Sequence, residues 1–425
     1  RIQRFLAEHS RLGIPALPHE EALAGLMGPG ATNFPQAIGM AASWDPEIVE
    51  QAAVAAGRQV RAVGARLALS PVIDIARDPR WGRLEETYGE DPELASRMAV
   101  AYVSAMQSGG VVCAAKHFLG YGVPDAGLNH GEVSIGPRRL RDVIAAPFRA
   151  AINEAGLAAV MNAYNEIDGI PCGGSPLILR DLLRGELGFT GTVVADYFAV
   201  ILLQHWHHVA GDVEEAARLA LTAGLDVELP DNSGYRTLPD QVRRGLVDET
   251  LVDEACLRVL TQKDAIGLVD NPYVDAAAAP AAFDTIADRA LARRAAARST
   301  VLLTNDGTLP LRPGARVAVL GPSADDPRLL FGDYHFPAHL EIMASGGRLI
   351  PMNGGTGHEM PPQIRTVTPL EALAERYELV ADPTSADVAV VCVGGRSGLT
   401  PESTSGEFRD ACDPVSYTHL RAHET

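Results

Sequence analysis

Short apolar runs alternate with longer amphipathic stretches between residues 13 and 228. The short runs predict buried strands, which lie at residues 13–17, 66–70, 111–115, 158–162, 192–195 and 225–228. Apolar positions at three-to-four spacing predict helices between them, at residues 46–63, 92–106, 140–154, 177–187 and 213–223. Repeated strand–helix units predict a parallel sheet covered by helices, and the length of this region is typical of a (β/α)₈ TIM-like barrel.

The pattern changes after residue 268. Residues 269–297 read as an Ala/Pro-rich linker followed by a helix. A second, smaller set of strand and helix signals then predicts a smaller α/β domain over residues 298–413, after the barrel of residues 1–268. The last segment, PVSYTHLRAHET at 414–425, resembles a translated sequencing adapter. We therefore expect a non-native tail there and a natural protein that is truncated at both ends.

Polar side chains gather where the predicted strands end. In a parallel barrel these ends open onto one face, where active sites are built. Any one of these residues could instead cap a helix or form a turn. Because polar residues recur at the same place, directly after each predicted strand, a shared site explains the set better than separate caps do. The set contains His19, Glu20, Glu21, Asp74, Lys116, His117, Asn162, Tyr164, Asp196 and Glu228.

Asp196 directly follows a β-branched run that is expected to be buried. A carboxylate in that place must be paired, hydrated or functional. If Arg83 and Lys116 keep it ionised, it can act as a nucleophile, and polar groups beside aromatic rings suit a sugar. Since glycoside hydrolysis uses a pair of carboxylates, we expect a second one on a distant element. The alternative for Lys116 and His117 is a structural ion pair.

The composition narrows the choice of partners. The formal net charge of −18 argues against nucleic acid or an anionic membrane as the main partner. The five cysteines are scattered and predict neither a disulfide framework nor a zinc site. The segment HWHH at residues 205–208 fits a loop at the mouth of a site better than a metal centre. The glycine turns at 321 and 394 lack a phosphate-binding fingerprint, so we expect no metal and no cofactor.

Several separate motifs resemble those of glycoside hydrolase family 3, the family of β-glucosidases and β-xylosidases. The resemblance covers nearly all of residues 1–413. It rests on RLGIPALPHEEALAG, ATNFPQAIGMAASWDPE, LSPVIDIARDPRWGRLEETYGEDP, AAKHFLGYG, VMNAYNEIDGIPCGGSP and GFTGTVVADYFAV. It implies the same fold class as the periodicity, a barrel followed by an α/β sandwich.

The resemblance also implies roles for individual side chains. Asp196 would be the nucleophile, and Glu407 in the segment GLTPESTSGEFRDACD would be the acid/base, with Glu402 in that segment as the alternative. The subsite for the terminal sugar would be lined by Glu21, Arg83, Lys116, His117, Met161 and Tyr164.

The implied activity is retaining, exo-acting hydrolysis of terminal non-reducing β-D-glucosyl residues of oligosaccharides or glycosides. The alternatives are a β-xylosidase or arabinosidase of the same family, or a sugar-binding fragment with impaired catalysis. The β-N-acetylhexosaminidase branch is disfavoured, because its Gly-His-Gly-Asp run is replaced by a sequence with Tyr121 in the place of the histidine. Localisation, in the cytoplasm or exported, and oligomeric state stay open.

Three departures from the family pattern stand out. Ala195 precedes the expected nucleophile where serine is usual, and Glu21 replaces the usual aspartate. The second domain also stops soon after Glu407, so we expect its loop to be poorly ordered.

Overall fold

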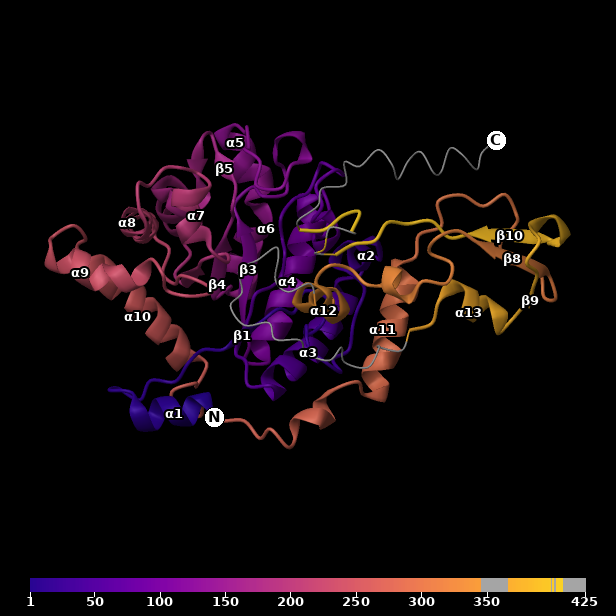
Figure 1. The fold of residues 1–425 in the computed structure, drawn as a ribbon, viewed down its shortest axis with the longest axis horizontal. Helices are drawn as coiled ribbons and strands as arrows, with labels where there is room; N and C mark the ends of the chain where they lie inside the picture. The colour runs from indigo at the N-terminus through magenta and orange to yellow at the C-terminus, as the bar shows by residue number, and fades with distance from the viewer. Residues whose placement is uncertain (345–365, 399, 401–402, 408–425) are drawn as a thin grey trace. The chain divides into compact units, whose positions relative to one another are not determined.

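The computed structural model describes residues 1–344, 366–398, 400 and 403–407 (Figure 1). The chain forms two compact units, Arg1–Ser299 and Thr300–Thr425.

The first unit is built on a parallel sheet whose strands follow the order of the chain. That sheet has the order β1-β2-β3-β4-β7, and its strands are β1 (His19–Glu20), β2 (Leu67–Ala68), β3 (Val112–Phe118), β4 (Ala159–Asn162) and β7 (Thr192–Val194). An isolated parallel bridge between Val194 and Val227 continues the same progression. Sequential parallel neighbours with helical crossovers are the arrangement of a TIM-like barrel, which confirms the α/β fold class predicted from the sequence.

Two predicted strands need correction. Residues 13–17 form no strand, and β1 begins at His19, because Pro15 and Pro18 lack the backbone N–H groups that a ladder needs. The predicted strand at residues 225–228 is reduced to the bridge at Val227. There the Asp226 carboxylate accepts the Val193 N–H at 2.8 Å, a donor that a longer ladder would use.

The sheet buries apolar side chains on both faces, as parallel sheets do. One face forms an inner cluster of Leu67, Leu69, Val112, Ala114, Ala159, Met161 and Val194. The alternate positions, among them Ala68, Cys113, Ala115, Val160 and Val193, face the larger cluster that the helices complete. The near-continuous apolar runs in the sequence follow from this two-sided burial.

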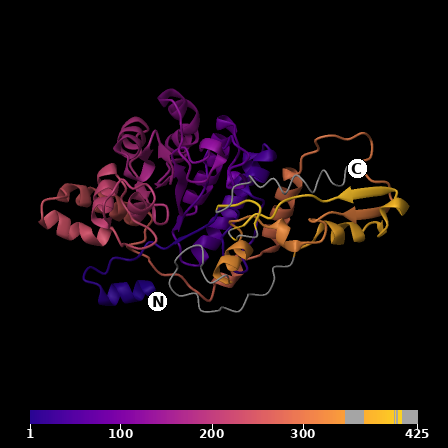
Figure 2. The same ribbon diagram turned by 45° about the horizontal axis from the view of Figure 1, so that its top comes forward.

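The crossover helices lie against the outer face. Helices α3 (Pro46–Ala62), α4 (Pro92–Ser108) and α6 (Ala146–Ala155) lie side by side, as the two ribbon views show (Figure 1, Figure 2). Helices α3 and α4 each begin with an aspartate N-cap, Asp45 or Asp91, followed by proline, which places these starts where the sequence predicts them.

The other elements of the first unit are shorter or more peripheral. They are α1 (Ile2–His9), α2 (Ala37–Ala42), η1 (Leu84–Glu86), η2 (Asp125–Gly127), α5 (Pro137–Arg139), η3 (Leu140–Ile144), the antiparallel pair β5 (Glu166–Ile167) and β6 (Ile170–Pro171), η4 (Cys172–Gly174), η5 (Leu177–Glu186), α7 (Ala199–His205), α8 (Val213–Ala223), η6 (Tyr235–Thr237), α9 (Leu238–Arg243), α10 (Glu249–Ala265), η7 (Ala279–Ala282) and α11 (Ile286–Ser299).

The two ends of the sheet approach each other. His19 Nε2 in β1 lies 2.7 Å from the hydroxyl of Tyr197, which follows β7. The Lys263 ammonium of α10 donates to the Pro15 carbonyl at 2.9 Å, so a late helix of the unit also contacts the segment before β1. These contacts join segments at the two ends of the sheet, as expected when a sheet curves toward closure.

The second unit contains a smaller parallel sheet, order β10-β8-β9. Its strands are β8 (Arg316–Leu320), β9 (Glu378–Leu379) and β10 (Val388–Val391). Its helices are η8 (Pro327–Leu330), α12 (Phe336–Ala344), α13 (Pro369–Ala374) and η9 (Pro383–Ser385). Thr368 and Glu371 form a reciprocal capping box that fixes the start of α13. No helix in the described part of the chain combines the length and the apolar character needed to cross a bilayer.

Candidate active site

The carboxyl ends of the strands bring several of the sequence-predicted side chains together. Glu21 follows β1, Asp74 follows β2, Lys116 and His117 lie in β3, and Asp196 follows β7. Direct contacts link these positions although they lie far apart in the sequence. The carboxyl ends of the strands are where barrel enzymes place their reacting groups.

Asp196 is 8% exposed and is held by groups from two strand ends. Its Oδ1 accepts from the Tyr197 N–H at 2.8 Å and from the Tyr164 hydroxyl at 2.9 Å. Its backbone N–H donates to Asn162 Oδ1 at 3.1 Å, which fixes the main chain at the end of β7. Phe198 then turns the chain with a left-handed φ of 69°, a conformation uncommon outside glycine. The carboxylate is therefore fixed in orientation.

Glu21 and Lys116 form an ion pair across the sheet, in which Lys116 is buried and Glu21 is partly buried. The Lys116 ammonium lies 2.9 and 3.0 Å from the two carboxylate oxygens of Glu21. Burial raises the pKa of Glu21 to about 7, although Lys116 favours its ionised form. The structure thus contains the ion pair that the sequence left as an alternative for Lys116. Such a pair can also present charged donors and acceptors to a hydroxylated ligand.

Arg83 is fully buried and pairs with Glu86, a residue that the sequence analysis missed. Its Nε and Nη2 donate to the two Glu86 oxygens at 2.7 and 2.8 Å, and its guanidinium lies 5.4 Å from the centre of the Tyr121 ring. A buried arginine needs such a counterion, so the i,i+3 spacing of Arg83 and Glu86 was the available signal. Tyr121 thereby belongs to the wall of the site.

His117 lies between two aspartates. Its Nδ1 is 2.8 Å from Asp74 Oδ2, and its backbone N–H donates to the same oxygen at 2.9 Å. On its other side, Nε2 is 3.5 Å from Asp196 Oδ2. Burial lowers the pKa of His117 well below its usual value, so the ring is neutral.

Aromatic side chains extend from Asp196 toward the surface. The centres of the Tyr164 and His130 rings lie 4.6 Å apart, and those of His130 and Trp206 lie 5.7 Å apart. Trp206 is 56% exposed. Trp206 belongs to the segment at residues 205–208 that the sequence placed in a loop at the mouth of a site, whereas His130 was not among the predicted site residues, because its loop carries no periodic signal.

The histidine-rich segment has structural contacts. His207 Nδ1 lies 2.7 Å from Glu166 Oε1. Among residues 1–344, 366–398, 400 and 403–407, no group of three or more His, Cys, Asp or Glu side chains is arranged to hold a metal ion.

Met161 lies in the inner apolar cluster and is 1% exposed. Its side chain belongs to the same face of β4 that the cluster fills. In the sugar-binding role that the resemblance implies, it would form an apolar floor.

Glu407 lies in the second unit, in a turn that closes on itself. Thr404 N–H donates to the Arg396 carbonyl at 2.7 Å and Gly398 N–H to the Ser405 carbonyl at 3.0 Å. Tyr334 lies just before α12, and its hydroxyl donates to Glu407 Oε2 at 2.9 Å. Glu402, the alternative acid/base, lies outside the described residues.

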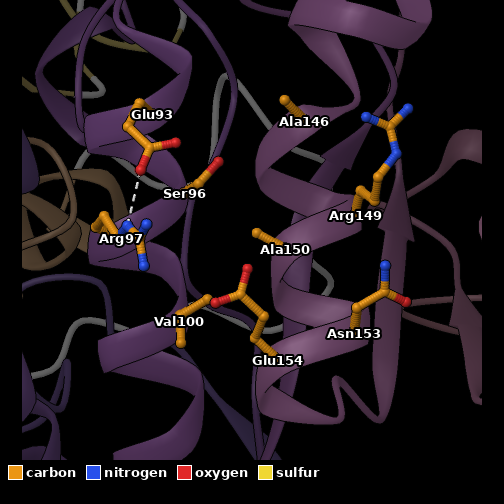
Figure 3. A pocket seen from close by; sticks show the side chains of 9 residues that line it. All are labelled: Glu93, Ser96, Arg97, Val100, Ala146, Arg149, Ala150, Asn153 and Glu154. Atoms are coloured by element: carbon orange, nitrogen blue, oxygen red, sulfur yellow. Dashed lines mark hydrogen bonds and ion pairs between the residues drawn. The ribbon is translucent and has the colours of Figure 1, made fainter.

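A hollow of about 230 Å³ lies between α4 and α6 on the helical side of the first unit (Figure 3). Its lining mixes both charges, and Arg97 pairs there with Glu93 at 2.8 Å. The lining contains none of the predicted site residues and consists of Glu93, Ser96, Arg97, Val100, Ala146, Arg149, Ala150, Asn153 and Glu154. The chemistry inferred above therefore does not lie in this hollow.

Comparisons with known proteins agree on the family. Residues 1–262 match the glycosyl hydrolase family 3 N-terminal domain, and residues 300–422 match the family 3 C-terminal domain. A β-xylosidase of Formosa agariphila is 37% identical over 350 residues, which are 77% of this chain and 48% of that protein. A β-glucosidase of Rhizobium radiobacter is 34% identical over 76% of this chain and 38% of its own length.

Solved structures give the same answer. A β-glucosidase from Erythrobacter marinus superposes with a TM-score of 0.81 at 36% identity, over 95% of this chain and 57% of that one. A Listeria innocua β-glucosidase in complex with glucose superposes with a TM-score of 0.78 at 30% identity, over 94% of this chain and 52% of that one. The chain spans about half the length of the curated relatives it matches first. On the evidence of both domains, the site and these relatives, the chain belongs to glycoside hydrolase family 3.

Proposed function

We propose that the protein is a retaining, exo-acting β-glycosidase in which Asp196 is the nucleophile. The observation that carries this proposal is the carboxylate at the end of β7, which Tyr164 and Tyr197 orient and beside which the His117 ring of β3 lies. A nucleophile needs such a fixed orientation, because it must meet the anomeric carbon in line with the departing oxygen.

The reaction has two steps. Asp196 attacks the anomeric carbon while Glu407 protonates the leaving oxygen, so a glycosyl–aspartate ester forms and the glycosidic bond breaks. Glu407 then takes a proton from water, the water oxygen attacks the anomeric carbon, and the ester bond breaks to release the sugar and the Asp196 carboxylate. This scheme requires the two carboxyl groups to stand about 5–5.5 Å apart during the reaction.

The sugar-binding roles follow from the same chemistry. Glu21 and Lys116 supply an acceptor and a donor for neighbouring ring hydroxyls, and His117 and Tyr164 supply polar atoms beside Asp196. Arg83 acts through its pair with Glu86 and its contact with Tyr121, so we assign it to orienting the site. Met161 forms the apolar floor.

We propose terminal non-reducing β-D-glucosyl residues as the substrate, with β-xylosyl or arabinosyl residues as the alternative. Relatives named β-glucosidases and relatives named β-xylosidases both support the class. The choice depends on whether the pocket accepts a hydroxymethyl group at C5, since this group distinguishes glucose from xylose.

Mechanism-based labelling tests the proposal on this chain. A 2-deoxy-2-fluoro-β-glucoside with a dinitrophenyl leaving group should attach to the peptide that contains Asp196, as seen by mass spectrometry. Turnover of aryl β-glycosides, followed by proton NMR, should release the β-anomer first. A label on another carboxylate, or an α-anomer as the first product, would overturn the assignment. If sugar raises the melting temperature but no aryl glycoside turns over, the chain is a sugar-binding fragment and the proposal is wrong.

The matching 2-fluoro-xyloside and 2-fluoro-arabinoside reagents decide the substrate. Faster inactivation by the glucoside supports the proposed preference, and faster inactivation by either pentoside reverses it.

A further inference from the structure

Asp74 makes an unusual contact with His117. One oxygen, Oδ2, lies 2.9 Å from the backbone nitrogen of His117 and 2.8 Å from its ring Nδ1. The other oxygen, Oδ1, is buried and has no hydrogen-bond partner among the described residues. Both side chains are almost completely buried. The contact joins β3 to the segment after β2, directly beside Asp196.

The protonation state of this pair decides what His117 presents to Asp196. If Asp74 is ionised, the ring proton lies on Nδ1, and the bare Nε2 lone pair faces Asp196 Oδ2 at 3.5 Å. Two acceptors at that separation repel. If Asp74 carries a proton on Oδ2, it donates to Nδ1 while the same oxygen still accepts the backbone N–H. The ring proton then lies on Nε2, 3.5 Å from Asp196 Oδ2, and this N–H makes no formed hydrogen bond to that oxygen in the structure.

The surroundings favour the second state. An ionised Asp74 would bury a charge with one oxygen unsatisfied, which is costly. Burial raises the pKa of Asp74 to about 7, and Arg83 opposes this rise. A doubly protonated ring is excluded because burial lowers the pKa of His117. The charged and titratable groups that face the pair are Arg83, Glu86, Lys116, Tyr121, His130, Cys172 and Asp196.

We propose that Asp74 is a positioning residue that, as a carboxylic acid, holds His117 in the Nε2–H tautomer and thereby makes it a donor toward Asp196. The catalytic meaning of this donor rests on the proposed function, in which Asp196 is the nucleophile. The N–H stabilises the negative charge that returns to Asp196 when the glycosyl–aspartate ester breaks.

Nitrogen-15 NMR of the histidine-labelled chain tests the tautomer directly. The His117 signals are identified by their loss in His117→Gln. At pH 5.5 we expect Nε2 to carry the proton and Nδ1 to be an acceptor. As the pH rises through about 7, Asp74 loses its proton and the ring proton should move to Nδ1. A His117 ring protonated on Nδ1 at pH 5.5 would refute the proposal.

Asp74→Asn supplies the matched variant. Its amide oxygen must accept the backbone N–H of His117 and cannot donate to Nδ1, so the ring should be protonated on Nδ1 at every pH. We expect kcat to fall about 10- to 100-fold at pH 5.5, as for loss of a hydrogen bond to a charged group. The wild-type decline in kcat above about pH 7 should be absent in this variant. Wild-type kcat in a folded Asp74→Asn protein would overturn the catalytic part of the inference.

Asp168→Asn is the control, because Asp168 is exposed and its left-handed φ of 51° accommodates asparagine. It should leave the pH profile and the His117 signals unchanged. The tautomer measurement needs no turnover, so it can fail while the Asp196 label succeeds, and the reverse. The two proposals are therefore separable.

Discussion

The two proposed catalytic carboxylates are held in different ways by the two units. Asp196 follows a fully buried strand, and donors from its own turn and from the neighbouring strand end fix its carboxylate. Glu407 lies in a short turn of the second unit, where backbone contacts close the turn and Tyr334 contacts the carboxylate. The proposed nucleophile thus directly follows a strand of the sheet, whereas the proposed acid/base is carried on a turn.

The first unit is also the more tightly packed of the two. Among the described residues, both large hydrophobic clusters belong to the first unit. Strand β10 in the second unit alternates between half-buried and exposed positions, and Val391 is largely exposed. Nucleophilic attack requires a carboxylate oxygen at a fixed distance from one carbon, whereas proton transfer tolerates adjustment of a turn. The comparison therefore predicts that substitutions at the first acid are the more damaging.

The largest effect is expected for Asp196→Ala. Loss of the nucleophile removes the covalent intermediate, so kcat on aryl β-glycosides should fall by about 10⁴-fold or more. Added azide should attack the substrate directly and give an α-glycosyl azide, which proton NMR distinguishes from the β-anomer. Asp253→Ala, an exposed substitution on α10, is the control and should keep full activity. Full activity in Asp196→Ala would show that another group attacks the anomeric carbon.

Glu407→Ala should have a smaller effect that depends on the leaving group. Without the acid, kcat should fall by about 10²- to 10⁴-fold for poorly leaving alcohols, and much less for dinitrophenol, which needs no proton. Azide should now restore turnover by attacking the glycosyl–aspartate, and the product should be a β-glycosyl azide. The two variants should therefore give azide products of opposite anomeric configuration, which distinguishes loss of the nucleophile from loss of the acid/base. If Glu402→Ala shows this pattern and Glu407→Ala does not, Glu402 is the acid/base.

The sequence predicted the sheet well where apolar runs were uninterrupted. Strands β3, β4 and β7 lie where such runs occur, because burial on both faces leaves a strong signal. The first strand was misplaced because Pro15 lies within the apolar run at residues 13–17 and Pro18 follows it. The last was overestimated because a side chain, Asp226, competes for the ladder hydrogen bonds.

Contacts at the site were harder to predict than its position. The recurrence of polar residues after strands indicated which face carries the site. It could not show that Asp74 pairs with His117, since that contact joins different strands and sequence periodicity describes single elements only. Glu86 was missed for a similar reason, because its importance depends on the burial of Arg83. His130 was missed because it lies in a loop, where spacing carries no information, whereas Trp206 lies in the segment at residues 205–208 that was expected at the mouth of a site.

Tyr334→Phe should give the smallest effect and tests how the second unit holds its acid. The substitution removes one hydroxyl and keeps the ring, so Glu407 loses the donor at 2.9 Å while the packing before α12 is conserved. We expect kcat to fall about 3- to 10-fold, as for one hydrogen bond. The loss should be greater for alkyl than for dinitrophenyl glycosides, because only the former need proton donation by Glu407.

A matched control separates this role from a general effect on the second unit. Tyr377→Phe removes a hydroxyl that makes no hydrogen bond with the described residues of that unit, and it should leave kcat unchanged for both classes of substrate. In the Glu407→Ala background, Tyr334→Phe should add nothing further, because the group it orients is already absent. An equal loss for alkyl and dinitrophenyl substrates, or an additive loss in the double variant, would show that Tyr334 acts on the fold of the unit and not on the acid. Glu407 would then be held by contacts other than the Tyr334 hydroxyl.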